Sequence, residues 1–136
     1  MRLQKVVFSA ERTVNHVSTG ETITFTNLNI NLGDGMNKDS GAFTVPLSGV
    51  YLFQFSGMTQ NSLKYTHIYI MKNGIKHHNI HYNNVNAATY ELMSYSWSMV
   101  LAKDDTVSLK VHENGLYVAA NHYYIYFTGQ LLFEHE

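Results

Sequence analysis

The side chains best suited to metal or acid–base chemistry are the eight histidines and ten acidic residues, and His77, His78 and His81 lie close together in the chain. In a β-strand, neighbouring side chains point to opposite faces, so His77 and His78 diverge. His77 and His81 share a face but lie too far apart to chelate one ion without a bend in the strand. This spacing favours surface or interface histidines over a metal site.

Catalytic signatures are not found in the sequence. It contains no nucleophile elbow and no His-Glu-x-x-His pattern, and the absence of Cys excludes thiol chemistry. The carboxylates of Asp104 and Asp105 are adjacent in a predicted turn, where they point apart and are solvated. We therefore expect a binding protein rather than an enzyme.

Tyrosine, histidine and asparagine are abundant near the predicted strand ends. Tyrosine has an apolar ring and a polar tip, which suits half-wet surfaces, subunit interfaces and sugar-binding sites. The alternative is that tyrosine is a good strand residue and that the asparagines form turns. The candidate ligand-binding residues are Asn61, Tyr65, His81, Tyr82, Asn114, Tyr117, Asn121, His122 and Tyr123.

Length and charge limit the classes of protein that remain. The 136 residues predict a single domain over 1–136, with a core from about residue 6 to residue 133. The net charge of -1 gives no basic footprint, so we expect no nucleic-acid partner. No apolar run is long enough to cross a bilayer, so we expect no membrane insertion.

The elements that must position these side chains are all strands. Tyr51, Phe53 and Phe55 recur at period two after the turn residues Pro46 and Gly49, which predicts a long strand with three rings on one face. Further strands are predicted at 6–8, 22–31 with a bulge near Thr26-Asn27, 42–45, 66–71, 75–82, 89–101, 107–112 and 122–133.

Turn signals separate these strands. Asn73-Gly74 fits a type I′ hairpin turn. In 89–101, Tyr95 and Trp97 share a face with Met99, and serines occupy the opposite face. Many short strands predict a β-sandwich or barrel, but spacing alone does not separate a jelly roll from an immunoglobulin-like sandwich.

One set of spaced residues is specific. It comprises Phe25, Asn31, Met36, Phe43, Gly49, Tyr51, Phe53 and Phe55. This pattern resembles the signature of the C1q globular domain of the C1q/tumour-necrosis-factor superfamily, which has an aromatic residue or Leu where this chain has Met36. Segments 8–16, 101–109 and 127–132 resemble strands of the same family, so the resemblance covers about residues 6 to 133.

The resemblance implies an all-β jelly-roll sandwich of two antiparallel sheets that assembles as a homotrimer. The candidate trimer contacts are Tyr51, Tyr69, Tyr124 and Tyr126. Members of the family are usually secreted, and residues 1–7 lack an apolar signal run. We therefore expect a secreted protein from which a signal peptide has been removed, with Met1 added.

The chain has no Gly-X-Y stretch, and in this it is similar to the stalkless C1q-domain lectins of invertebrates. That similarity implies an innate-immunity pattern-recognition lectin that binds a glycan or glycoprotein, such as sialic acid or a microbial polysaccharide. The alternatives are a receptor-binding cytokine, a cerebellin-like signalling ligand, or the trimerisation head of a larger protein.

A cofactor is not required by this interpretation. Calcium stays open as an alternative, because several C1q-domain proteins hold it near the trimer apex. By resemblance its ligands here are Asn83, Asn84 and Glu91, with the Thr89 carbonyl. This set carries one formal charge, whereas Ca²⁺ favours several hard, charged oxygens.

Overall fold

The computed structural model describes residues 5–59, 65–83, 90–119 and 124–135. The strands are β1 (Val7–Arg12), β2 (Asn27–Leu32), β3 (Met36–Asn37), β4 (Ala42–Thr44), β5 (Gly49–Thr59), β6 (Tyr65–Lys72), β7 (Ile75–Asn83), β8 (Leu92–Leu101), β9 (Thr106–Glu113), β10 (Leu116–Tyr117) and β11 (Ile125–Glu134). In the described part of the chain, no helix is long and apolar enough to cross a membrane.

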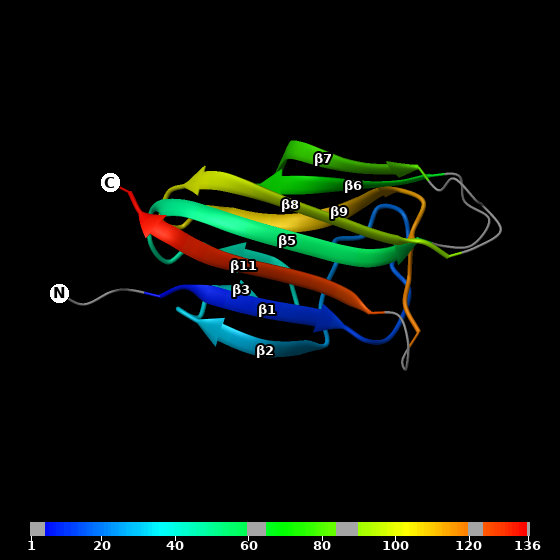
Figure 1. Ribbon diagram of the computed structural model, residues 1–136, viewed down its shortest axis with the longest axis horizontal. Coiled ribbons are helices and arrows are strands. Elements are labelled where there is room, and N and C mark those ends of the chain that lie inside the picture. Colours follow the sequence, from blue (N-terminus) through cyan, green and yellow to red (C-terminus); the bar gives the residue numbers. More distant parts are fainter. Residues whose placement is uncertain (1–4, 60–64, 84–89, 120–123, 136) are drawn as a thin grey trace.

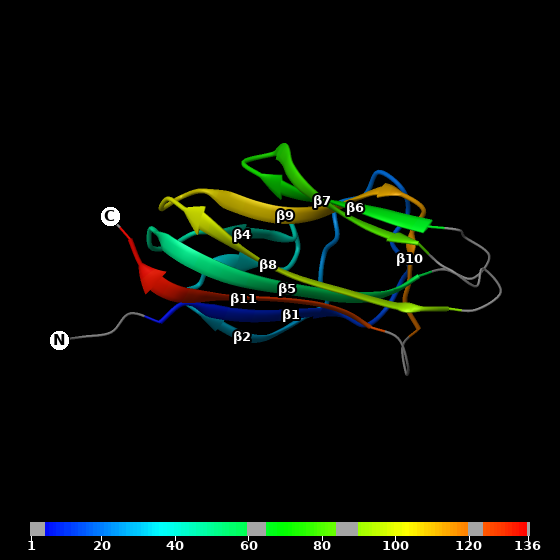
Figure 2. The same cartoon turned by 45° about the horizontal axis from the view of Figure 1, so that its top comes forward.

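The strands form two antiparallel sheets that pack face to face (Figures 1 and 2). The first sheet has the order β10-β5-β11-β1-β2, with β8 also paired to β5, and the second has the order β3-β4-β9-β6-β7. Strand β1 begins and β11 ends at the same end of the sandwich (Figure 1), because the two strands pair antiparallel. The expected jelly-roll sandwich is confirmed.

Aromatic rings fill the space between the sheets. Tyr51, Phe53 and Phe55 are buried along one face of β5, as their period-two spacing predicts. The ring of Phe8 lies 4.8 Å from that of Phe43 and 5.0 Å from that of Phe127, between ring centroids. Rings at these separations in tilted and edge arrangements add to the stability gained by burying their surface.

The residues of the C1q-like signature have identifiable structural roles. The Asn31 side chain donates to the Met36 carbonyl at 3.0 Å and accepts from the Met36 N–H at 3.1 Å. It thereby holds the turn that brings the buried Met36 beside Phe43. Gly129 packs directly beneath the Phe8 ring, and any side chain there would collide with that ring.

Some expected boundaries were wrong. Residues 22–26 are not part of a strand; only Thr22 makes an isolated bridge, to Lys110. The irregularity in β2 falls where Ser9 pairs with Ile30 and Ala10 with Leu28, so the bulge is at Asn29 rather than at Thr26-Asn27. The short strands β3 and β10 were not expected, because two residues carry no period.

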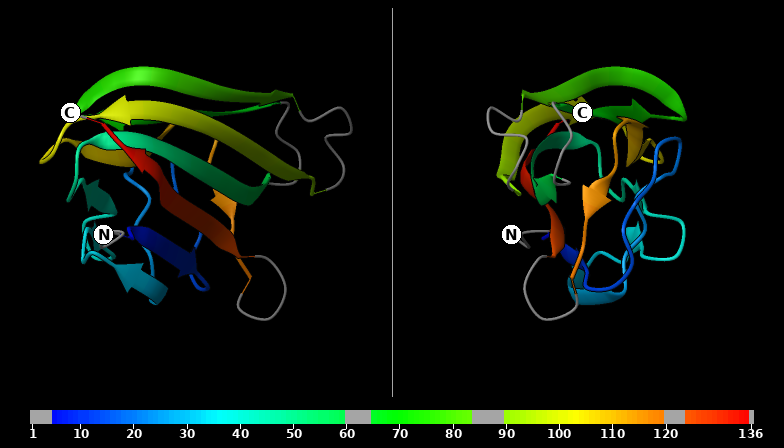
Figure 3. Two further views of the ribbon diagram at one scale, coloured as in Figure 1. Left: turned by 60° about the vertical axis from the view of Figure 1, so that its left-hand side comes forward. Right: turned by 90° about the vertical axis from the view of Figure 1, so that its right-hand side faces the viewer.

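The Asn73-Gly74 turn has positive φ angles of 54° and 78°, which a type I′ turn requires. The β6–β7 hairpin that it closes lies along one edge of the sandwich, next to β8 (Figure 3). His78 Nε2 of β7 and Tyr95 Oη of β8 are hydrogen-bonded there at 2.9 Å. The hairpin thus covers one open side of the sandwich, and β7 is an edge strand of the second sheet.

Candidate functional site

The outward side of the second sheet gathers aromatic and imidazole rings. On β6, the buried residues Thr66, Ile68 and Ile70 alternate with outward-facing ones. Strand register pairs His67 with His81, and Tyr69 with Asn79. Directly opposed residues of antiparallel strands share a face, so these side chains are neighbours. We call the set Tyr65, His67, Tyr69, Asn79, His81, His112 and Glu113 the histidine–tyrosine face.

A β-bulge places two consecutive residues of β9 on this face. Ile68 pairs with Val111 while His67 pairs with Glu113, so His112 is an extra residue in β9. A bulge breaks the strict alternation of a strand and redirects a side chain. As a result, His112 Nε2 lies 3.8 Å from Glu113 Oε1, although the two residues are adjacent in sequence.

Hydrogen bonds and stacking fix the side chains of the face. Tyr65 Oη donates to Glu113 Oε2 at 2.6 Å. Asn79 Nδ2 lies 2.7 Å from His67 Nε2. The rings of Tyr69 and His112 are stacked, with centroids 4.2 Å apart and an interplanar angle of 14°. The arrangement is therefore a connected layer of side chains.

The same contacts shift the protonation equilibria of three groups. The hydrogen bond between Tyr65 and Glu113 shifts both groups. It lowers the pKa of the Glu113 carboxyl and raises the pKa of the Tyr65 hydroxyl. Burial and, secondarily, the charges of His81 and His112 lower the pKa of His67. His67 is consequently held in its neutral form, with a ring nitrogen lone pair available, at neutral pH.

Two lysines border the face. Lys76 Nζ lies 4.6 Å from the centroid of the Tyr69 ring, within the range of a cation–π contact. Lys110 pairs with Tyr69 from the other neighbouring strand, β9. The charges of these two lysines outnumber that of Glu113, the one carboxylate among the residues that define the face. An anionic group therefore meets a favourable environment there.

The structure brings three of the predicted ligand-binding residues together. Tyr65 and His81 lie on the histidine–tyrosine face with their ring centroids 5.2 Å apart. Asn114 is adjacent, but its Nδ2 donates to the Tyr65 carbonyl at 2.7 Å and its φ is 58°. The Asn114 amide thus holds a turn, as the alternative interpretation of the asparagines proposed.

Two other predicted residues lie apart from this group. Tyr82 points to the other side of β7 and donates to Glu91 Oε1 at 2.9 Å, which raises the pKa of Tyr82. Tyr117 lies in β10, where its ring centroid is 4.2 Å from that of Tyr90 and 4.7 Å from that of His16. The described members of the predicted set therefore do not all lie together.

Several predictions fall outside the described residues. These are the proposed ligand-binding residues Asn61, Asn121, His122 and Tyr123, and the proposed calcium ligands Asn84 and Thr89. Asn83 is exposed at the end of β7, and the Glu91 carboxylate accepts the bond from Tyr82. Calcium binding stays a prediction.

His67 and His112 were not among the predicted site residues. The signal that could have found His67 is the alternation Tyr65, His67, Tyr69 against Thr66, Ile68, Ile70. For His112 no such signal exists, because its orientation depends on the bulge in β9. His77, His78 and His81, which the sequence suggested as a cluster, do not form a metal-binding group among the described residues.

The outward side of β5, β8 and β11 in the first sheet has a different chemistry. We call it the uncharged face; it comprises Val50, Leu52, Gln54, Ser56, Met58, Leu92, Ser94, Ser96, Ser98, Val100, Tyr126, Thr128, Gln130 and Leu132. None of these side chains carries a charge. Val100 and Leu92 are each 62% exposed and Leu132 is 48% exposed. Depletion of charge with exposed apolar groups is typical of subunit interfaces.

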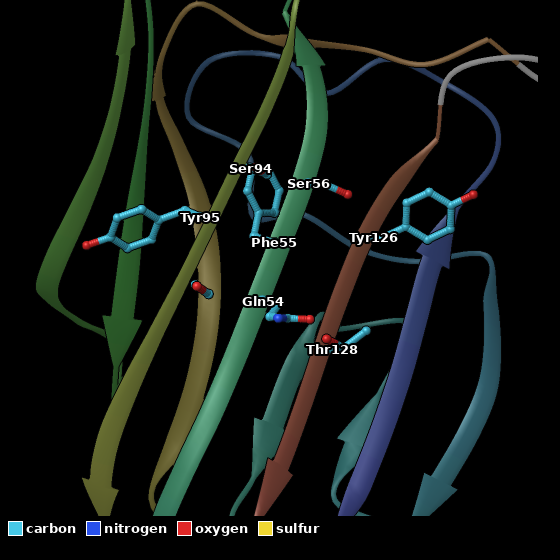
Figure 4. A pocket seen from close by; sticks show the side chains of 8 residues that line it. Gln54, Phe55, Ser56, Ser94, Tyr95, Tyr126 and Thr128 are labelled. Atoms are coloured by element: carbon cyan, nitrogen blue, oxygen red, sulfur yellow. The ribbon is translucent and has the colours of Figure 1, made fainter.

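A shallow groove of about 360 Å³ crosses this face, lined by Gln54, Ser56, Ser94, Tyr126 and Thr128 (Figure 4). Tyr126, one of the expected trimer contacts, lines this groove and is 41% exposed. The expectation for Tyr51 was wrong. Its ring is fully buried within the single chain and its hydroxyl donates to the Leu47 carbonyl at 2.6 Å, so it belongs to the core.

Tyr124 and Tyr69 complete the expected trimer contacts. Tyr124 is partly buried, with its ring centroid 6.1 Å from that of Tyr126. Tyr69 belongs to the histidine–tyrosine face on the other sheet. Its role as a contact between subunits stays a prediction.

The family is decided by a match over nearly the whole chain. A model of the C1q domain matches residues 7–132. The chain belongs to the C1q domain family. Domains of this family bind and signal rather than catalyse, and trimers are typical of them. The resemblance recognised from Phe25, Asn31 and the aromatic strand is therefore confirmed.

Relatives and a solved structure agree with this assignment. The chain is 28% identical over 130 residues to complement C1q tumor necrosis factor-related protein 3 of Mus musculus, covering 96% of this chain and 52% of the relative. It is 32% identical to Caprin-2 of Danio rerio over 96% of this chain and 14% of that protein. The globular domain of zebrafish complement 1qA superposes with a TM-score of 0.76 at 18% identity, covering 96% of this chain and 99% of that one.

The chain thus spans about half the length of the C1q tumor necrosis factor-related relative that it matches, and less of Caprin-2. The family and the jelly-roll fold follow from these similarities. The ligand and the assembly of this particular chain do not follow from them.

Proposed function

We propose that this chain is a secreted, homotrimeric C1q-domain lectin that binds acidic glycans through the histidine–tyrosine face. The observation that carries the proposal is the union, on one outward face, of aromatic rings with amide, imidazole and ammonium groups. Tyr65 supplies an aromatic ring, Asn79 an amide and His81 an imidazole. Lys76 supplies an ammonium group. Sialic acid and acidic microbial polysaccharides are the ligands that this chemistry fits.

The sugar chemistry follows from the groups present. The C–H face of a pyranose packs on an aromatic ring, while its hydroxyls bind amide and imidazole groups. The carboxylate of an acidic sugar is attracted by Lys76 and Lys110, which flank Tyr69. His81, exposed at the edge of the face, adds a ring that can donate or accept.

Trimerisation supports the same proposal. The uncharged face supplies an apolar surface without competing charges, and a second copy of the chain is its proposed occupant. Three histidine–tyrosine faces on one rigid assembly bind a multivalent glycan surface with an avidity that a single weak site lacks. Binding to cell surfaces or microbial polysaccharides is therefore expected to depend on the trimer.

The test is a glycan array probed with the intact protein, with and without a chelator. We expect binding to sialylated or other acidic glycans, and we expect His81→Ala to weaken it by about tenfold, the loss of one good polar and stacking contact. His77→Ala, which removes an exposed histidine of β7 that is not part of the face, is the matched control. Failure to bind any glycan at high valency would reject the lectin, and loss of binding in chelator would favour the calcium alternative.

A second candidate is a receptor-binding signalling ligand of the cytokine or cerebellin type. The similarity over 96% of this chain to complement C1q tumor necrosis factor-related protein 3 favours it. Saturable binding to cells that survives enzymatic removal of surface glycans would support this candidate over the lectin. The same similarity, covering 52% of the relative, also fits a trimerisation head of a larger protein.

A further inference from the structure

We propose that His67, His112 and Glu113 form a zinc site on the outward side of the second sheet. Their ligand atoms all lie within 4.8 Å of one another. His67 Nδ1 lies 3.9 Å from Glu113 Oε1, and His112 Nε2 lies 3.8 Å from that same oxygen. Two strands contribute to the site, and the bulge in β9 makes it possible. The three ligands belong to the histidine–tyrosine face, but zinc binding by them does not require that the face bind a glycan.

The distances are close to those of a bound site. Zinc–nitrogen and zinc–oxygen bonds of about 2.0–2.1 Å in a tetrahedron separate neighbouring ligand atoms by about 3.3 Å. The group therefore needs to contract by roughly 0.5 Å along the two sides that meet at Glu113, and by up to about 1.5 Å between the two imidazoles. His112 is exposed and Glu113 half-exposed, so rotation about their side-chain bonds supplies this movement without a change in the strands.

Each of the three ligands already has a second partner that would orient it. Tyr65 Oη donates to Glu113 Oε2 and leaves Oε1 for the ion. The Tyr69 ring stacks on His112 and fixes its plane. His67 has Nε2 at 2.7 Å from the Asn79 amide and Nδ1 towards Glu113. Supporting contacts of this kind accompany metal ligands in proteins.

The Asn79 contact also sets the tautomer that metal binding needs. A half-turn of the amide exchanges its nitrogen and oxygen at little cost. Asn79 Oδ1 then accepts the Nε2–H of His67, and the Nδ1 lone pair of His67 points at the ion.

The donor set selects zinc over calcium. Two imidazole nitrogens and one carboxylate are borderline ligands that suit Zn²⁺, whereas Ca²⁺ takes six to eight oxygens. Three protein ligands leave a fourth position of the tetrahedron for water or an incoming donor group. His81, with its ring centroid 5.2 Å from that of His67, is the nearest further imidazole on the face.

Isothermal titration of the intact protein with ZnCl₂ at neutral pH tests the site. We expect one zinc ion per chain, and a loss of affinity of at least about tenfold in His112→Gln and in Glu113→Gln, because each removes one of three ligands. His77→Gln is the matched control and should bind as the wild type does. Circular dichroism and the melting temperature of each zinc-free variant check that it is folded.

Two further measurements separate the possible outcomes. Zinc should raise the melting temperature of the wild type and of His77→Gln but not that of His112→Gln, because binding to the folded state stabilises it. Cobalt substituted for zinc should give visible d–d absorption that Glu113→Gln weakens. Binding that is equally weak in all variants would mean adventitious surface histidines only and would overturn the proposal. So would an absence of binding.

Discussion

The two outward faces of this sandwich differ in chemistry although the same kind of alternating strand builds both. On the uncharged face, β5, β8 and β11 present aliphatic groups, hydroxyls and amides. On the histidine–tyrosine face, β6, β7 and β9 present rings with ionisable groups. Of the described residues in the second sheet's strands, only Ile75 is an exposed large apolar side chain.

Under the proposed function, this difference separates assembly from recognition on one scaffold. The inward residues of both sheets are mostly apolar and fill a common core. The two faces differ in their outward residues. Small uncharged side chains such as Ser94 and Ser96 allow another chain to approach closely, whereas a layer of Tyr65, His67 and Glu113 held by hydrogen bonds offers directional contacts.

A charge on the uncharged face should have the largest effect. Ser96→Asp would bury a carboxylate without a partner at the proposed subunit interface, which costs several kcal/mol for each chain. We expect a monomer where the wild type is a trimer, by light scattering or sedimentation. Ser108→Asp, the same change on the second sheet, should stay trimeric. A trimer in Ser96→Asp would show that this face is not the interface.

A cavity in the shared core should affect both faces alike. Phe53 is fully buried, with its ring centroid 5.4 Å from that of Trp97 and 5.9 Å from that of Phe127. Phe53→Ala should lower the free energy of unfolding by about 3–5 kcal/mol in chemical denaturation. A loss below about 1 kcal/mol would contradict the core described for β5.

Removal of one hydroxyl should alter the histidine–tyrosine face alone. Tyr65→Phe deletes the bond to Glu113 Oε2, and the pKa of Glu113 should rise towards its ordinary value because its main stabilising contact is lost. An NMR pH titration of the Glu113 carboxyl measures this, with Tyr69→Phe as the control. The trimer mass should not change. An unaltered Glu113 titration would show that the bond does not form in solution.

Acidification should lower the stability of the protein by a smaller amount, through the contact between the β6–β7 turn and the β8–β9 turn. Asp105 accepts hydrogen bonds from Asn73 Nδ2 at 3.0 Å and from the Ala102 N–H at 2.9 Å. These bonds lower the pKa of Asp105 in the folded state. Its contribution to stability is therefore complete above the unfolded pKa and is lost as the pH falls through the folded pKa.

The variant Asp105→Asn should lose that part of the pH dependence. Melting temperatures from neutral to acidic pH measure it, and Asp104→Asn, whose side chain makes neither bond, is the matched control. Equal pH dependence in Asp105→Asn and the wild type would exclude a role for this carboxylate in joining the β6–β7 turn to the β8–β9 turn.

The sequence was sufficient for most strands because they depend on local period, whereas the jelly-roll topology was implied by the resemblance that a few spaced positions carry. Tyr51, Phe53 and Phe55 alternate into the core, Asn73-Gly74 forms the type I′ turn, and Asn31 holds Met36 through its side chain. The first two roles follow from residue type and spacing and were predicted, whereas Asn31 was recognised only as a position of the family signature, and its bonds to Met36 came from the structure.

The candidate site could not be predicted in the same way. His67, His112 and Glu113 meet because β6 pairs with β9, strands that β7 and β8 separate in the sequence. The alternation rule also places His112 and Glu113 on opposite faces, and the bulge overrides it. By contrast, Tyr65 and His81 were found because each lies at the end of an evident strand.

Hydroxyl-radical footprinting of the intact protein in solution, read by mass spectrometry, tests both faces in one measurement. The account predicts that Met58, Tyr126 and Leu132 are protected, although Tyr126 is 41% exposed and Leu132 48% exposed in the single chain. It predicts that Tyr65, His81 and His112 are modified. Protection of those three residues with modification of Tyr126 and Leu132 would contradict the assignment of assembly to the first sheet and recognition to the second.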